Sequence, residues 1–129
     1  FPPVDGYVTQ GLNLSEDSES HNGIDVAAAF GADIKSPAKG MIVFSGKGIE
    51  TGNTIIISHD FGFYTVYGHN DTNLVRERDI VAAGQVIAKV GDTGESDGPH
   101  LHFEIWKNNR VLDPRDLIEE YKKKDVSIR

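Results

Sequence analysis

Short runs of β-branched and aromatic residues recur along the chain and alternate with glycine-rich segments. This pattern is typical of strands joined by tight turns, because β-branched side chains suit a pleated surface and glycine adopts turn conformations. The clearest predicted strands cover Gly40–Ser45, Asn53–His59, Phe63–Tyr67, Gln85–Val90 and Leu101–Trp106, with turns at Gly46-Lys47-Gly48 and Gly91-Asp92-Thr93-Gly94. Connections this short join antiparallel neighbours, so the fold is predicted to be all-β with antiparallel sheets.

One short helix is predicted near the C-terminus. Asp113 can cap it, Pro114 suits its first position, and Asp116 falls in its first turn. We expect this helix to cover an edge or an end of a sheet. Just before it, Asn108-Asn109 predicts a hairpin turn, since asparagine tolerates the positive φ that such turns need.

The length of 129 residues, 38% of them hydrophobic, suffices for one core but not comfortably for two. We therefore expect residues 1–129 to form a single domain. No apolar run approaches the roughly 18 residues of a membrane span. Phe1-Pro2-Pro3 has neither an initiator Met nor the basic start of a secretory signal, which favours a fragment of a longer protein.

Charge and cysteine content narrow the possible functions. The net charge of -7 disfavours nucleic-acid binding, because phosphate neutralisation needs clustered Lys and Arg. The chain has no cysteine, which excludes disulfides, thiolate metal sites and cysteine nucleophiles. Any metal must therefore bind to nitrogen and oxygen ligands.

Two histidines lie two residues apart in the segment Gly98–Trp106. Side chains alternate between faces along a strand, so Leu101, Phe103 and Ile105 are predicted to enter the core. His100, His102, Glu104 and Trp106 then share the opposite face. Two neighbouring imidazoles repel if both are charged, so they favour a neutral, hydrogen-bonded or metal-bound state. Because the motif is short, it fits hydrogen bonding on a half-buried surface as well as metal binding.

A second cluster, His21-Asn22-Gly23-Ile24-Asp25, offers an imidazole and a carboxylate four residues apart. Gly23 and the β-branched Ile24 and Val26 favour a loop that runs into a strand, not a helix. Both side chains can still turn towards one point. An ordinary hydrogen bond between the two within the loop is the alternative.

Together the two clusters supply histidine and aspartate ligands with imidazoles to spare. Catalytic zinc typically has three protein ligands and an open position for water. The H-E-x-x-H helix that supplies a general base in many metallopeptidases is absent, so histidine must fill that role. The candidates are His69 and whichever histidine of the His100/His102 pair does not bind metal.

In order and approximate spacing, the motifs resemble those of the lysostaphin-type (LytM-like) peptidoglycan endopeptidases, from about Gly6 to Leu117. The matching segments are His21-Asn22-Gly23-Ile24-Asp25, Ile34–Gly40, Tyr64-Thr65-Val66-Tyr67-Gly68-His69, Gly84–Ile87, Gly91–Gly94 and Gly98–Glu104.

The resemblance implies an antiparallel β fold with a groove, and Zn²⁺ held by His21, Asp25 and His102. It implies that His100 and His69 orient and deprotonate the attacking water and stabilise the oxyanion. The implied reaction is hydrolysis of peptide cross-links in peptidoglycan by an exported protein of the periplasm, cell envelope or extracellular space. A regulatory segment or partner outside this chain is also expected.

Two positions depart from the family pattern. Asn70 follows His69 where Leu is common, and Arg78 stands before Asp79 where Gly is usual, so a local turn is expected to differ. Neither is among the implied ligands. His59 closes a predicted strand and is followed by Asp60, so we expect it to make a hydrogen bond in a turn.

Three alternatives remain at this stage. The family includes members that have lost metal ligands and activate other wall hydrolases, so a non-catalytic module that binds the wall or regulates a hydrolase is the leading one. A biotinyl or lipoyl carrier would need Lys89 in a different local setting. A His-Asp-His facial triad could also hold non-haem iron, although nothing in the sequence suggests a cosubstrate.

Overall fold

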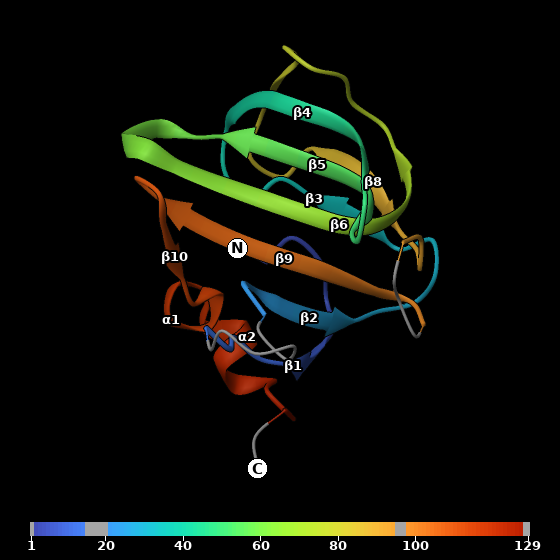
Figure 1. The fold of residues 1–129 in the computed structure, drawn as a ribbon, viewed down its shortest axis with the longest axis vertical. Helices are drawn as coiled ribbons and strands as arrows, with labels where there is room; N and C mark the ends of the chain where they lie inside the picture. Colours follow the sequence, from blue (N-terminus) through green and yellow to red (C-terminus); the bar gives the residue numbers. More distant parts are fainter. Residues whose placement is uncertain (1, 15–20, 95–97, 128–129) are drawn as a thin grey trace.

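The computed structural model describes residues 2–14, 21–94 and 98–127. Its strands form one ten-stranded sheet, and every ladder between named strands is antiparallel, as predicted (Figure 1). The strands are β1 (Tyr7–Gln10), β2 (Ile24–Ala27), β3 (Asp33–Lys35), β4 (Gly40–Gly48), β5 (Gly52–Ser58), β6 (Phe63–Asn73), β7 (Ile80–Val81), β8 (Val86–Val90), β9 (His100–Lys107) and β10 (Arg110–Leu112). The main path runs β1-β2-β9-β6-β5-β4-β7.

Strand β6 changes its partner along its length. Its first part, from Phe63 to Gly68, pairs with β9, whereas Asn70 to Asn73 pair with β8, which in turn pairs with β3. On its other side β6 pairs with β5, and the register slips there between Tyr67 and Asn70. An extra residue on one strand produces such a bulge and turns the local side chains. His69 lies at this position.

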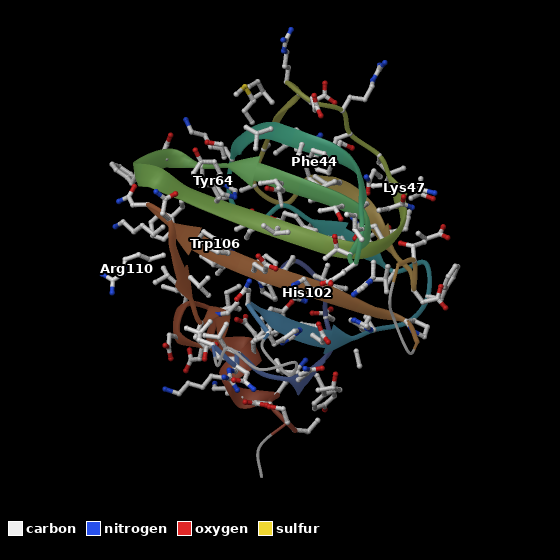
Figure 2. The ribbon with its side chains drawn as sticks, viewed as in Figure 1. Phe44, Lys47, Tyr64, His102, Trp106 and Arg110 are labelled. Carbon is white, nitrogen blue, oxygen red and sulfur yellow. The ribbon has the colours of Figure 1, made fainter. Side chains whose placement is uncertain are left out.

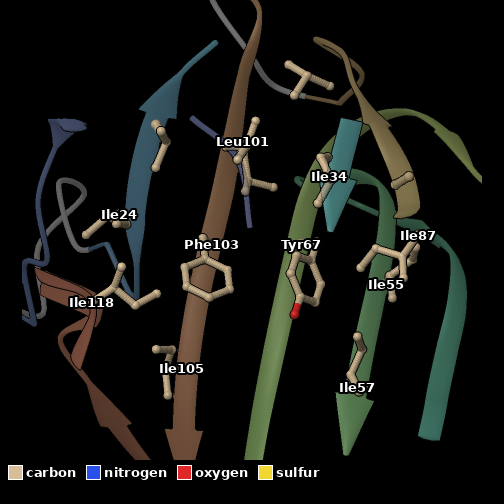
Figure 3. Packing of buried hydrophobic residues seen from close by; sticks show 14 of the residues in the cluster. Ile24, Ile34, Ile55, Ile57, Tyr67, Ile87, Leu101, Phe103, Ile105 and Ile118 are labelled. Atoms are coloured by element: carbon tan, nitrogen blue, oxygen red, sulfur yellow. The ribbon is translucent and has the colours of Figure 1, made fainter. Parts of the chain in front are cut away.

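The core follows the alternation predicted for β9. Leu101, Phe103 and Ile105 are buried on one face, and Phe103 packs against Tyr67 of β6 with ring centroids 5.4 Å apart (Figure 3). Isoleucines of β2, β3, β5 and β8 complete this layer. Burying Phe103 and Tyr67 fully fixes β9 against β6, and this pairing in turn fixes the side chains on the opposite face.

The predicted C-terminal helix is present but divided in two, α1 (Pro114–Leu117) and α2 (Glu119–Lys123), beside β10 and β1 (Figure 1). The Asp113 carboxylate caps α1 by accepting a hydrogen bond from the backbone N–H of Arg115 at 3.0 Å. Between the helices Ile118 has extended backbone angles (φ −121°, ψ 105°) and a buried side chain. Burial of this β-branched residue interrupts the helix. Within the described residues, no helix is long and apolar enough to span a membrane.

Two of the predicted turns can be located in the structure. Asn108 and Asn109 both have positive φ (48° and 72°) and join β9 to β10, which confirms the predicted hairpin. The turn predicted at Gly46-Lys47-Gly48 is wrong, because these residues belong to β4 and pair with β5 as far as Gly48 opposite Gly52. The chain reverses at residues 49–51 instead.

Candidate metal centre

Three adjacent strands bring the candidate residues into one row. In the β2–β9 register Asp25 faces His102, and in the β9–β6 register His102 faces Gly68, the residue before His69. His21 lies in the loop before β2, and an antiparallel bridge to Asn13 holds it there. This agrees with the predicted loop running into a strand. Segments distant in the sequence therefore meet at the centre of the sheet.

Asp25 is the centre of this cluster. Its Oδ1 lies 3.2 Å from Nε2 of His21 and 3.0 Å from Nδ1 of His102, and one ligand atom from each of the three residues lies within 4.8 Å of the other two. His102 is only 6% exposed, so the face that carries it is more buried than the sequence pattern suggested. The alternative given for His21 and Asp25, an ordinary hydrogen bond within the loop, does not account for the convergence of His102.

The outer ring nitrogen of each candidate histidine ligand is held in place. Nδ1 of His21 lies 3.0 Å from the carbonyl oxygen of Gly11, and Nε2 of His102 lies 2.7 Å from Oε2 of Glu104. A carbonyl or carboxylate oxygen can only accept, so these nitrogens carry protons. A neutral ring then directs its lone pair at Asp25. Two lone pairs and a carboxylate converging on one point suit a cation, and all donors are the nitrogen and oxygen types that zinc accepts.

Charge is concentrated at this point. Burial alone would raise the pKa of Asp25, but hydrogen bonds with His102 and His21 outweigh it and hold that pKa well below its usual range. Burial alone would lower the pKa of His102, yet its bonds to Asp25 and Glu104 raise this pKa to about 9. A proton and a metal ion would compete for Nδ1 of His102, and metal binding would release that proton.

His69 owes its position to the bulge in β6. Its backbone has φ 64°, an uncommon value for a non-glycine residue. Its Nδ1 donates to the carbonyl oxygen of Thr93 at 2.6 Å, so a neutral ring carries its lone pair on Nε2. Burial lowers the pKa of His69 below its ordinary value, which keeps the ring neutral and able to accept a proton at neutral pH.

His100 is the second imidazole beside the cluster. Its ring centroid lies 4.7 Å from that of His69, while the rings of His69 and His102 are 6.1 Å apart. Nδ1 of His100 donates to the carbonyl oxygen of Gly98 at 3.0 Å, and its Nε2 lies 3.6 Å from Oδ2 of Asp25. The two imidazoles therefore flank the metal-ligand candidates without belonging to the group of three.

A groove of about 540 Å³ crosses the same face of the sheet. It is lined by Phe44, Gly48, Thr51, Thr54, Ile56, Tyr64, Val66, Glu104, Trp106 and Asn109. Figure 2 shows His102 and Trp106 along β9, with Tyr64 on the neighbouring strand β6. Because Glu104 bonds to His102 and also lines the groove, the groove adjoins the cluster. Its largely apolar lining suits an extended chain better than a small polar solute.

Not every histidine takes part. His59 donates and accepts elsewhere, with Nδ1 2.8 Å from the carbonyl oxygen of Lys39 and Nε2 2.7 Å from Oγ1 of Thr65. The role is structural, as expected, but the ring bonds to Lys39 and to strand β6 and not within its own turn. Glu104 and Trp106 were assigned no role from the sequence, although their spacing of two places both on the face of His102.

Comparison with known proteins places this arrangement in a family. The model of "Peptidase family M23" matches residues 19–114. Over 113 residues the chain is 42% identical to the murein hydrolase activator NlpD of Salmonella dublin, covering 87% of this chain and 29% of that protein. A zinc-containing peptidase from Vibrio cholerae has a TM-score of 0.81 and 36% identity, covering 86% of this chain and 37% of the other.

The catalytic domain of the antimicrobial peptidase lysostaphin from Staphylococcus simulans has a TM-score of 0.76 and 30% identity, covering 90% of this chain and 92% of the other. These matches confirm the lysostaphin-type resemblance and the all-β fold class. The family match also contains all five residues predicted for the site, from His21 to His102. The chain belongs to peptidase family M23.

Proposed function

We propose that this chain is a zinc-dependent endopeptidase that hydrolyses peptide cross-links of bacterial peptidoglycan. The observation that carries the proposal is the convergence of His21, Asp25 and His102, with two further imidazoles beside them and a groove alongside. The zinc-containing peptidase of Vibrio cholerae supports the choice of metal, and the murein hydrolase activator supports a wall substrate. The chain spans 29% of the length of that activator, so the proposal concerns the activity of this segment.

The proposed site divides its tasks between two sets of residues. His21, Asp25 and His102 would hold the ion through Nε2, a carboxylate oxygen and Nδ1. When bound, zinc supplies a Lewis acid that polarises the scissile carbonyl and acidifies a coordinated water. Three protein ligands leave coordination positions for water and substrate.

His69 and His100 would manage the proton. With Nδ1 of each ring committed to a backbone carbonyl, the neutral rings present Nε2 as a base. We assign to this pair the removal of a proton from the attacking water and its return to the departing amine. In their protonated form the same rings would stabilise the negative charge on the tetrahedral intermediate. The groove lined by Tyr64 and Trp106 would hold the stem peptide or cross-bridge in register with the scissile bond.

A wall substrate implies a location in the envelope or outside the cell, and we propose that location for the protein. We propose that the substrate is a glycine bridge or a D-alanyl link to the diamino acid of the stem peptide, because either is an extended chain that suits the groove.

The decisive test is digestion of purified peptidoglycan. Zinc-loaded protein should release fragments whose masses identify the broken bond, from walls that carry glycine bridges or from walls with direct stem-peptide links. Chelator should stop the release, and added zinc should restore it. Asp25→Ala serves as the inactive control, because the three-ligand set leaves no redundancy.

A second function is favoured by the 42% identity to a murein hydrolase activator. The chain would then bind the wall or another hydrolase without cutting. In that case zinc-loaded protein releases no fragment alone but accelerates release by a separate wall hydrolase. Asp25→Ala would keep the acceleration, whereas an endopeptidase would lose its own product formation.

A further inference from the structure

The Glu104 carboxylate connects a candidate metal ligand to the single tryptophan of the chain. Its Oε2 lies 2.7 Å from Nε2 of His102, and its Oε1 lies 2.7 Å from Nε1 of Trp106. The three residues follow one another at spacings of two along β9, so one face of the strand carries all three. The Glu104 side chain is only 14% exposed, and its geometry is therefore set by its neighbours.

The hydrogen-bonding roles within this chain of residues are fixed. The indole N–H of Trp106 can only donate, and an ionised carboxylate can only accept. Glu104 therefore requires a donor at Nε2 of His102, which leaves Nδ1 as the nitrogen that faces Asp25. Rotating the His102 ring or moving its proton would break the 2.7 Å bond. The carboxylate thus sets both the orientation of the ring and the nitrogen offered to a metal.

Glu104 is held from more than one direction. Across the β9–β6 ladder its partner is Val66, which has no polar side-chain group, so the second oxygen of Glu104 finds its donor along its own strand in Trp106. On the other side, a Cβ at Gly23 would lie 2.8 Å from Cγ of Glu104, so the aliphatic part of Glu104 packs against the loop between His21 and Asp25. Trp106 itself lines the groove, in register with Tyr64.

We propose that Glu104 is a positioning residue for the metal centre and that Trp106 keeps Glu104 in place. The inference rests on the metal site of the proposed function. An outer partner that orients a metal-ligating histidine typically contributes 10- to 100-fold in metal affinity or activity. Because Trp106 lines the groove, this chain of hydrogen bonds also connects the substrate groove to ligand His102.

Glu104→Gln is the sharpest variant. Its amide has one accepting oxygen, so the oxygen that bonds to His102 leaves the NH₂ group opposite the indole N–H, donor against donor. We expect zinc binding, measured by competition with a chromophoric chelator, to weaken about 10- to 100-fold. Trp106→Phe removes the opposing donor and should weaken binding only a few-fold. The double variant should bind zinc no more weakly than Glu104→Gln alone, and that non-additivity indicates one connected unit.

Tyr64→Phe is the matched control, since Tyr64 lines the same groove opposite Trp106 and should leave zinc affinity within about twofold. The indole N–H signal of Trp106 gives a second readout, unambiguous because the chain has one tryptophan. We expect this signal to shift when zinc is added to the wild type, and to differ between the wild type and Glu104→Gln. In Glu104→Gln the zinc response should be lost or strongly reduced.

The proposal would be overturned if folded Glu104→Gln and Trp106→Phe bound zinc as tightly as the wild type and the indole signal of the wild type did not change on zinc addition. These measurements do not depend on turnover. A wild type that binds zinc but cuts no wall contradicts the proposed enzyme and leaves the positioning role intact. If the wild type binds no zinc, both proposals fail, whereas a selective loss in the variants supports this one.

Discussion

Asp25 and His102 are cross-strand partners on β2 and β9, with Oδ1 of the carboxylate 3.0 Å from Nδ1 of the imidazole. Directly opposed residues of an antiparallel pair have the closest approach that a sheet offers. A slip of one residue in this register would turn the side chain of Asp25 to the core face. The backbone pairing of β2 with β9 therefore determines whether the candidate metal centre exists.

Removing either partner should abolish the site. We expect Asp25→Ala and His102→Ala to lose stoichiometric zinc, measured by elemental analysis after gel filtration, and to lose wall hydrolysis. Three ligands leave no substitute for a missing one. His59→Ala is a suitable control, because His59 bonds to Lys39 and Thr65 and should retain full zinc. Stoichiometric zinc in Asp25→Ala would show that the ion binds elsewhere.

His69→Ala should separate metal binding from catalysis. His69 is not among the three converging ligands, so we expect the variant to retain zinc. The rate of release of wall fragments should fall by roughly 10²- to 10⁴-fold, the usual contribution of a general acid or base. Full turnover by the zinc-loaded variant would exclude His69 as the proton acceptor.

Gly23→Ala should damage the site through the backbone. A Cβ at this position would lie 2.2 Å from the carbonyl oxygen of Phe103, so β2 would have to move away from β9. We expect a loss of about 1–3 kcal/mol in the free energy of unfolding, as for other overpacked positions, and weaker zinc binding. The same substitution at Gly46 of β4 meets only the movable ring of Phe44 at 3.2 Å and should have little effect. Equal effects at the two glycines would contradict this account.

Much of the site could be predicted because its signals are local. Apolar Leu101, Phe103 and Ile105 alternate with polar residues, and this alternation predicts which face of β9 each side chain occupies. Gly23 followed by β-branched Ile24 indicates a loop that enters a strand. The order of the motifs then supplied the family. The structure brings the five predicted residues together.

Other features depend on contacts between distant segments. The bulge that orients His69 lies where β6 stops pairing with β9 and begins to pair with β8. The amino-acid types around Gly68 do not predict it. The helix break comes from burial of Ile118, which tertiary packing decides. Glu104 was on the correct face, but its role depends on which donors lie within reach of its two oxygens, and only the folded chain determines this.

The free energy of unfolding should depend on pH in the acid range through the ion pairs of Arg115. Its guanidinium donates to Oδ1 of Asp113 at 3.0 Å, to Oδ2 of Asp113 at 2.7 Å and to Oδ2 of Asp125 at 2.7 Å. Burial alone would raise the pKa of Asp113, but the hydrogen bonds from Arg115 outweigh it and lower this pKa. A depressed folded-state pKa contributes stability above the unfolded pKa of about 3.9, and that contribution is lost as the pH falls through the folded-state value.

We therefore expect Arg115→Gln to lower the free energy of unfolding by about 1–2 kcal/mol near pH 7. The difference from the wild type should persist down to about pH 5 and shrink below about pH 4, in urea titrations at each pH. Lys123→Gln affects only an exposed pair with Glu119 at 3.7 Å and should change stability by less than about 0.5 kcal/mol. A difference that grows in acid would contradict the assignment.

Arg78 gives a test of a departure from the family pattern. It stands where glycine is usual in the family pattern, and its φ of 78° lies in the left-handed region that favours glycine. An L-residue in this region costs roughly 1–2 kcal/mol, whereas the extra chain entropy of glycine costs about 0.5–1 kcal/mol. Arg78→Gly should therefore raise the free energy of unfolding by up to about 1 kcal/mol, or a few degrees in Tm.

Arg76→Gly is the control. Arg76 lies in the same exposed turn but has no positive φ, so only the entropic cost of glycine applies and the free energy of unfolding should fall. If the two substitutions change the free energy of unfolding in opposite directions, backbone conformation is the cause of the effect. Changes in the same direction would refute that cause.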